Sequence, residues 1–139
     1  MALKIKKGFK QMVDEAKSRV KQTSLEEGKS KLGKDGVVFV DLRDVRELER
    51  EGVIPGAVHA PRGMLEFWVD PESPYHREVF APGRPLLLFC AAGWRSALAA
   101  RSLLEMGVEP VAHLEGGFSA WKAAGAPVAD KPAKVPAAD

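Results

Sequence analysis

The sequence predicts an α/β protein built around a parallel sheet. Two short, strongly apolar runs at residues 37–40 and 86–89 have the composition of strands that are buried on both faces of such a sheet. Segments with helical spacing alternate with these strands, and this alternation is typical of parallel α/β architecture. A chain of 139 residues accommodates one such domain with a single hydrophobic core.

An amphipathic helix is predicted ahead of the first strand, over residues 5–20. Its apolar side chains recur at intervals of three and four and form one stripe: Ile5, Phe9, Met12, Val13, Ala16 and Val20. We expect this stripe to pack on the domain rather than on a membrane surface, because Phe9 is its only bulky aromatic residue. Ser24 and Glu27 have the spacing of a capping box and predict a second short helix ending near residue 32.

The segment between the two apolar runs predicts short helices around one brief strand. The charged residues 45–51 predict a helix that ends at Gly52, and residues 57–59 predict a strand after an Ile-Pro-Gly turn. Residues 64–69 predict a further short helix. The prolines and glycines that follow, as far as Pro85, predict mainly loop.

After the second apolar run, the chain predicts helices at residues 96–106 and 118–124 with a strand at 108–114 between them. The Ala- and Pro-rich residues 129–139 cannot bury enough apolar surface to fold, so we expect a disordered tail. The expected organisation is a basic helical arm, then one α/β domain, then this tail. Their bounds are residues 1–34, 35–128 and 129–139.

Composition and charge narrow the functional classes. No apolar run approaches the roughly 20 residues that span a bilayer, so no membrane span is expected. No secretory signal peptide is recognised, so we expect a cytoplasmic location. Residues 1–34 hold ten Lys and Arg against four Asp and Glu, a charge of +6, while the remaining residues carry −4. This arm matches no nucleic-acid-binding motif, and we expect no nucleic-acid partner.

Cys90 is the only cysteine, and it directly follows the second apolar run. A single thiol excludes an intramolecular disulfide, a Cys-x-x-Cys redox pair and a zinc site with several cysteines. The three histidines lack the spacing of metal ligands. We therefore expect no metal and no cofactor, and any thiol chemistry depends on Cys90.

The loop after Cys90 has the composition of an anion cradle. Ala91, Ala92 and Gly93 leave room for a ligand to approach the backbone, and Gly93 can adopt a positive φ. Backbone N–H groups of this loop and of the following helix N-terminus can converge on one point, and Arg95 adds a fixed positive charge. Such surroundings favour a thiolate near neutral pH, and the thiolate is the nucleophile.

The remaining loop residues allow more than one interpretation. Trp94 is expected over the rim of the loop, where it shields the site, contacts a partner or simply packs. Arg95 offers a planar fork to a sulfonate or phosphate group, or else pairs with a carboxylate such as Asp41 or Asp44. Ser96 is expected to be the N-cap of the following helix.

A free cysteine is usually a small buried hydrophobe, and that role is the alternative for Cys90. A purely structural cysteine needs neither a glycine-containing loop nor an arginine after it. The end of a strand in an open α/β sheet is also where ligands bind. The combination favours chemistry at Cys90.

Four motifs in register resemble those of the single-domain rhodanese-like sulfurtransferases. They are Asp41-Leu42-Arg43, the segment from Gly52 to His59 (GVIPGAVH), the Cys90 loop (CAAGWRS), and the segment from Gly116 to Trp121 (GGFSAW). The resemblance spans residues 37–128. It implies a five-stranded parallel sheet with helices on both faces, preceded here by the amphipathic helix.

The resemblance also implies a reaction. Cys90 would take sulfane sulfur from thiosulfate or a persulfide donor and pass it, as a persulfide, to cyanide or a thiol. The backbone of residues 91–96 would stabilise the persulfide, and Arg95 and Arg62 would attract the anionic donor. Asp41 and Arg43 would support the architecture of the site. A protein sulfur donor or acceptor would suit the same loop.

Two alternatives remain at this point. A phosphatase or arsenate reductase would also use Cys and Arg, but four residues separate Cys90 from Arg95, whereas cysteine phosphatases resemble one another in having five. They also commonly have His before the cysteine, where this chain has Phe89. The second alternative is a non-enzymatic sulfur-carrier or protein-interaction module with the same fold.

Overall fold

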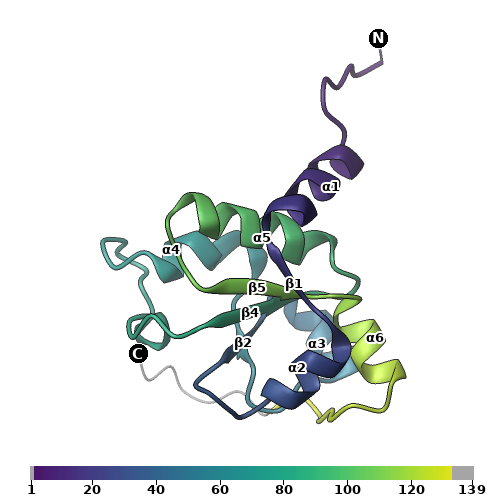
Figure 1. Cartoon of the computed structure of the whole chain (residues 1–139), viewed down its shortest axis with the longest axis vertical. Coiled ribbons are helices and arrows are strands. Elements are labelled where there is room, and N and C mark those ends of the chain that lie inside the picture. Colours follow the sequence, from purple (N-terminus) through teal and green to yellow (C-terminus); the bar gives the residue numbers. More distant parts are fainter. Residues whose placement is uncertain (1, 133–139) are drawn as a thin grey trace.

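In the computed structural model of the chain, which describes residues 2–132, five parallel strands form one sheet in the order β1-β5-β4-β2-β3 (Figure 1). The strands are β1 (Lys21–Thr23), β2 (Val38–Asp41), β3 (Val58–His59), β4 (Leu86–Phe89) and β5 (Val111–Leu114). The helices are α1 (Phe9–Arg19), α2 (Leu25–Lys31), α3 (Val45–Glu51), α4 (Leu65–Val69), α5 (Trp94–Glu105) and α6 (Gly117–Ala123). Two 3-10 turns, η1 (Arg62–Met64) and η2 (Glu78–Phe80), lie in the segment before β4. The predicted α/β fold is confirmed.

Helices cover both faces of the sheet. α1, α4 and α5 lie on one face, and α2, α3 and α6 lie on the other (Figure 1). Alternate side chains of β4 pack on opposite faces of the sheet. Leu86 and Leu88 belong to the hydrophobic core on the side of α4 and α5, and Leu87 and Phe89 belong to the core on the side of α6. All four side chains are buried, as the predicted two-sided burial of this run requires.

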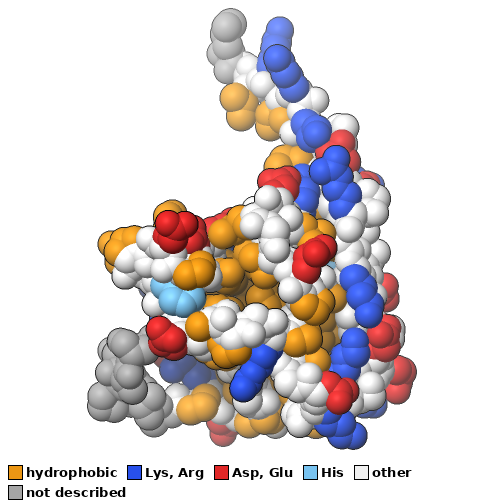
Figure 2. Space-filling view, turned by 60° about the vertical axis from the view of Figure 1, so that its left-hand side comes forward, with side chains coloured by type: hydrophobic (Ala, Val, Ile, Leu, Met, Phe, Trp, Pro, Cys, Tyr) orange, Lys and Arg blue, Asp and Glu red, His pale blue; other side chains and the backbone are white. Residues whose placement is uncertain are grey.

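The N-terminal helix starts later than its apolar stripe predicts. α1 begins at Phe9, so Ile5 lies outside the helix and is 66% exposed. Further along the stripe, Val13 and Ala16 are buried against Ala97 of α5, as expected for a helix that packs on the domain. The segment before α1 projects from the body of the molecule and carries basic side chains (Figure 2).

Strand β1 was not predicted from the sequence. Its three residues are polar, and among them only Thr23 is buried. The segment is a strand because it pairs in parallel with β5, where Lys21 lies opposite Ala112 and Thr23 opposite Leu114. An element from within residues 1–34 therefore forms one edge of the sheet.

The C-terminal elements lie within a few residues of their predicted places. α5 and α6 overlap the predicted helices but end one residue earlier, and β5 occupies the second half of the predicted strand. The predicted tail lies mostly outside the described residues, but Ala129, at its start, pairs with Val53 in an antiparallel bridge. Within residues 2–132, every helix is too short or too polar to cross a membrane.

Candidate active site

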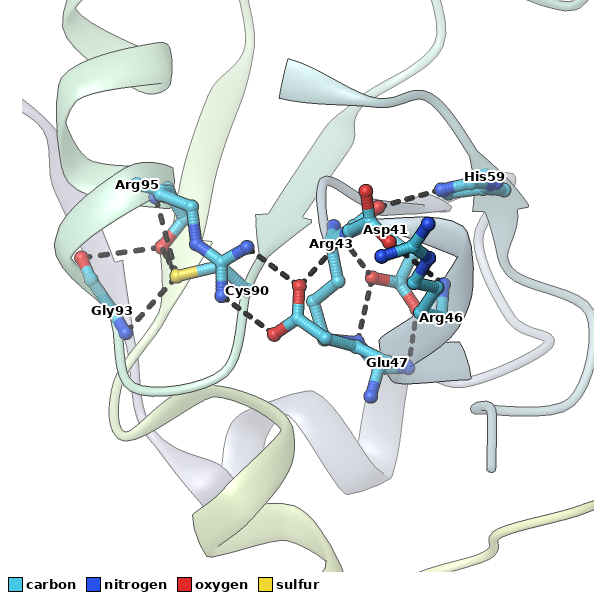
Figure 3. Close-up of polar contacts among 10 residues, drawn as sticks. Asp41, Arg43, Arg46, Glu47, His59, Cys90, Gly93 and Arg95 are labelled. Atoms are coloured by element: carbon cyan, nitrogen blue, oxygen red, sulfur yellow. Dashed lines mark hydrogen bonds and ion pairs between the residues drawn. The ribbon is translucent and has the colours of Figure 1, made fainter. Parts of the chain in front are cut away.

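Cys90 directly follows β4, the middle strand of the sheet, and is 1% exposed. Its Sγ accepts hydrogen bonds from the backbone N–H groups of Gly93 at 3.1 Å and Ser96 at 3.4 Å (Figure 3). Within the described chain, these are the backbone donors that reach the sulfur. The loop therefore wraps the thiol with main-chain dipoles, as the anion-cradle interpretation of residues 91–96 expects.

The helix behind the loop begins two residues earlier than predicted. α5 starts at Trp94, and its N-cap is Gly93 with a φ of 111°, a conformation that favours glycine. The prediction that Ser96 is the N-cap was therefore wrong. Ser96 lies instead in the first turn of the helix, fully buried, with its Oγ 3.6 Å from Cys90 Sγ. This start places the N-terminus of α5 directly at the sulfur.

The start of α6 holds the cysteine loop in place. The Phe118 N–H donates to the Cys90 carbonyl at 2.7 Å, and the Ser119 N–H donates to the Ala91 carbonyl at 3.0 Å. Gly117 has a φ of 60°, and a Cβ at this position would collide with the Cys90 carbonyl oxygen. The double glycine before Phe118 thus permits close contact between two main-chain segments.

Arg95 forms a bidentate ion pair with Glu47 of α3. The two nitrogen–oxygen distances are 2.8 and 2.9 Å (Figure 3). The expected structural partners, Asp41 and Asp44, are therefore incorrect. The Arg95 guanidinium, together with the Asp44 backbone N–H, holds the pKa of Glu47 at about 2, and Glu47 in turn raises the pKa of Arg95.

Glu47 was not selected from the sequence as a site residue. Its capping-box spacing after Asp44 was the available signal, and the structure contains that box, with the Asp44 N–H donating to Glu47 Oε2 at 2.8 Å. This signal identifies a helix start and says nothing about Arg95. The ion pair links residues that lie far apart in the sequence.

Asp41 and Arg43 form a buried pair at the end of β2. Arg43 donates to both Asp41 oxygens at 2.9 and 2.7 Å and to the Gly52 carbonyl at 2.9 Å. Its guanidinium lies over the Phe118 ring, 3.9 Å from the centroid. His59 contacts the Arg43 carbonyl through Nε2 at 2.6 Å. The Arg43 side chain is 1% exposed, so its charge is neutralised by Asp41 inside the fold. Its bonds therefore support the segment between β2 and Gly52 beside the site.

Arg62 and Trp94 were also predicted to belong to the site. Arg62 pairs with Glu66 at 2.8 Å and, with Gly63 and Arg95, lines a small pocket beside the loop. Trp94 is 57% exposed, and its ring packs on Phe9 of α1 with 5.0 Å between centroids. The N-terminal helix therefore reaches the rim of the cysteine loop, a specific contact that was not predicted from the sequence.

The groups around the Cys90 sulfur are two main-chain N–H groups and the side chains of Ser96 and Arg95. Within residues 2–132, no three His, Cys, Asp or Glu side chains are placed to hold a metal ion. A buried sulfur facing main-chain N–H groups at a helix N-terminus can carry negative charge. The arrangement therefore suits nucleophilic attack by sulfur and storage of an anionic sulfur adduct.

The chain is similar to proteins with rhodanese-like domains. The family model of the rhodanese-like domain matches residues 24–124. An uncharacterized protein of Synechocystis is 37% identical over 67% of the chain, which spans only 47% of that relative. The thiosulfate sulfurtransferase GlpE of Pseudoalteromonas translucida is 33% identical over 67% of the chain and 80% of its own length.

A solved structure from Rhodopseudomonas palustris is similar over nearly the whole chain. It is described as a protein of unknown function and a possible tyrosine phosphatase. The TM-score is 0.89 with 47% identity, and the match covers 93% of this chain and 99% of that one. Its match therefore includes much of the N-terminal segment that precedes residue 24.

Proposed function

Since the chain belongs to the rhodanese-like domain family, we propose that it is a sulfurtransferase that carries sulfane sulfur as a persulfide on Cys90. The observation that carries this proposal is the pair of backbone N–H groups, from Gly93 and Ser96, directed at the Cys90 sulfur. These donors stabilise the Cys90 thiolate that attacks the sulfur donor and that is released again when the acceptor takes the sulfur. The similarity to a thiosulfate sulfurtransferase supports the same reaction.

The proposed transfer has two displacement steps. In the first, the Cys90 thiolate attacks the outer sulfur of thiosulfate, a new S–S bond forms, and sulfite leaves with the electron pair of the broken S–S bond. In the second, cyanide or an acceptor thiolate attacks the outer sulfur of the persulfide, and Cys90 leaves as a thiolate. A persulfide donor would load Cys90 in the same way, with a thiolate as leaving group. Two displacements on one nucleophile predict ping-pong kinetics.

The lone cysteine determines where the sulfur goes next. The 139-residue sequence has no second cysteine that could attack the Cys90 persulfide and close a disulfide. No other thiol among these residues can take the sulfur, so the proposed acceptor is cyanide, a small thiol or a protein thiol. A cytoplasmic location stays a prediction from the sequence.

The basic residues at the mouth would select and orient the donor. Arg95 and Arg62 line the pocket beside the loop, and we propose that they attract an anionic donor such as thiosulfate. Each is paired with a carboxylate, Glu47 or Glu66, which offsets part of the charge that the arginine offers to a donor.

Mass spectrometry of the intact protein tests the proposal. Incubation with thiosulfate should add one sulfur, about 32 Da, as expected for a covalent intermediate, and cyanide should remove it. Cys90→Ser is the matched control and should gain no mass. A folded wild-type protein that stays unmodified with both thiosulfate and a persulfide donor would favour the non-enzymatic interaction module instead.

A phosphatase is the second function to test, because the Rhodopseudomonas palustris structure is described as a possible tyrosine phosphatase. The four residues between Cys90 and Arg95 argue against it, since a shorter loop suits a sulfur atom better than a whole phosphate group. The Arg95 fork, which would have to bind phosphate oxygens, is bound to Glu47. We expect no hydrolysis of an aryl phosphate above the Cys90→Ser background.

A further inference from the structure

A buried line of three polar side chains runs inward from the active-site sulfur. Cys90 Sγ lies 3.6 Å from Ser96 Oγ, and Ser96 Oγ lies 3.1 Å from His113 Nδ1. Ser96 is fully buried and His113 is 1% exposed. His113 belongs to β5, in register with Leu88 of β4, so the adjacent strand carries it behind the cysteine loop. Neither the proposed reaction nor the family motifs use this histidine.

The second ring nitrogen of His113 indicates which hydrogen bond the ring makes. Nε2 is buried and has no hydrogen-bond partner among the described residues. A proton on Nε2 would be a buried donor without an acceptor, which is costly, whereas a bare Nε2 costs less. Burial, and secondarily the charge of Lys17, lowers the pKa of His113 to about 4, so the ring is neutral at pH 7. The single proton then belongs on Nδ1, and the ring donates to Ser96 Oγ.

This donation leaves the Ser96 hydroxyl proton to point elsewhere. Its two acceptors are the Gly93 carbonyl at 3.3 Å and the Cys90 sulfur at 3.6 Å. When Sγ is a thiolate, its charge attracts the hydroxyl proton more strongly than a neutral carbonyl does. The Ser96 side chain then adds a third donor to the two backbone N–H groups.

We propose that His113 is a positioning residue, which, by donating to Ser96 Oγ, directs the Ser96 hydroxyl at the anionic sulfur of Cys90. The inference rests on the proposed function in one respect, namely that Cys90 works as an anion. Successive hydrogen bonds in a buried site polarise one another, so the neutral ring strengthens the final bond without taking a proton itself. Its role is to stabilise the anion, and it does not touch the substrate.

Other charged groups also face this line of residues. Arg95, on α5, interacts electrostatically with Cys90, and its partner Glu47, on α3, offsets part of that charge. Lys17, on α1, faces His113. A test must therefore change the hydrogen bond at His113 while leaving these three charges in place. Substitutions at positions 113 and 96 alone meet that condition.

The pH dependence of Cys90 alkylation by iodoacetamide tests the inference directly. His113→Leu should move the midpoint of the pH–rate profile upward, with a roughly threefold lower rate at pH 7, because the anion loses support. His113→Asn should stay close to wild type, since its side-chain amide can donate from about the position of Nδ1. His113→Gln should resemble His113→Leu, since its amide reaches toward the position of Nε2.

Ser96→Ala distinguishes an effect of His113 that acts through Ser96 from a general effect of changing a buried residue. It should shift the profile at least as far as His113→Leu, and the double variant should shift it no further, because residues that act through one bond are not additive. Thr23→Val is the control. It also removes a buried hydroxyl, but one that has no hydrogen-bond partner among the described residues, so it should leave the profile unchanged.

Two results would overturn the inference. One is a His113→Leu shift that is equally large with and without Ser96, and the other is identical profiles for folded His113→Asn and His113→Gln. The Asn and Gln variants keep the test decisive should His113→Leu not fold. Alkylation needs no sulfur donor, so a failure to form the persulfide would count against the proposed function and leave this experiment intact.

Discussion

Glu47 and Arg95 together set the charge at the mouth of the cysteine loop. Arg95 reaches from the first turn of α5 to Glu47 in the first turn of α3, so the ion pair spans the site (Figure 3). A bidentate carboxylate fixes the orientation of the guanidinium and leaves part of its charge available. We therefore expect both residues to affect donor binding as well as stability.

Arg95→Ala should reduce kcat/KM for thiosulfate by roughly tenfold or more, but that for a persulfide donor by only a few-fold. The reason is that thiosulfate carries two negative charges near the guanidinium, whereas a persulfide is less charged. Steady-state kinetics with both donors measures the difference. Arg50→Ala, which removes an exposed arginine from α3, is the control. Equal losses with the two donors would assign Arg95 a purely structural role.

Glu47 makes the stability of the chain depend on pH. Because the folded-state pKa of about 2 is below the ordinary value of 4.5, the pair contributes stability above about pH 4.5 and loses it as the pH falls toward 2. Glu47→Gln should therefore lower the free energy of unfolding by about 1 kcal/mol at neutral pH, a modest amount because the pair is partly exposed. The difference should shrink below about pH 4.5.

Urea denaturation of wild type and Glu47→Gln at pH 7, 4 and 3 measures this dependence. Glu49→Gln changes an exposed carboxylate on the same helix and serves as the control. A difference between wild type and Glu47→Gln that stayed constant over this pH range would show that the charge of Glu47 is not responsible.

At the scale of elements, the cysteine loop depends on two helix N-termini. α5 supplies donors to the sulfur, and α6 supplies donors to the carbonyls of Cys90 and Ala91. The second contact requires glycine at 117, because the main chains approach closely and φ is positive there. The first turn of α6 thus acts as a clamp that keeps the loop in its curved shape.

Gly117→Ala should displace the loop and lower sulfur transfer by tenfold or more, with a loss of roughly 2–4 kcal/mol in stability. Gly125→Ala is the matched control, since Gly125 also has a positive φ but an added Cβ meets nothing within 4 Å. Thermal unfolding and the persulfide assay, run on both variants, separate backbone strain from displacement of the loop. Similar activities for the two variants would contradict the clamp.

On the scale of the whole molecule, the N-terminal segment and the active site are physically connected. α1 packs on α5 and β1 extends the sheet beside β5 (Figure 1). The Phe9 ring also packs on the ring of Trp94, the first residue of α5. The division at residue 34 into an arm and a separate domain stays a prediction from the sequence. These contacts favour one cooperative unit.

Ala16→Asp tests whether the chain unfolds as one unit. Ala16 is fully buried on the face of α1 that packs against Ala97 of α5, and an unpaired carboxylate there should cost roughly 3 kcal/mol or more. In a single cooperative unit, this cost lowers the midpoint of the whole unfolding transition, followed by circular dichroism and by tryptophan fluorescence. Ser18→Asp, at an exposed position of the same helix, should change it little. If residues 1–34 unfolded independently of the domain, Ala16→Asp would not change the midpoint of the main unfolding transition.

Much of the fold could be predicted because local patterns reflect burial. The apolar runs that became β2 and β4 are buried on both faces, which leaves few alternatives for their structure. The start of α1 was misplaced because Ile5 continues the stripe past the point where the body of the protein ends. β1 was missed because its polar residues form a strand only by pairing with β5.

The sequence alone determined the candidate nucleophile and its loop: one cysteine, at the end of an apolar strand, before a glycine whose φ is positive in the structure. These features are local, since strand burial and backbone conformation are encoded in adjacent residues. Tertiary structure alone decided that Arg95 meets Glu47 and that His113 stands behind Ser96. Such contacts join distant segments, and their partners are chosen by the packing of helices and strands, which no local pattern records.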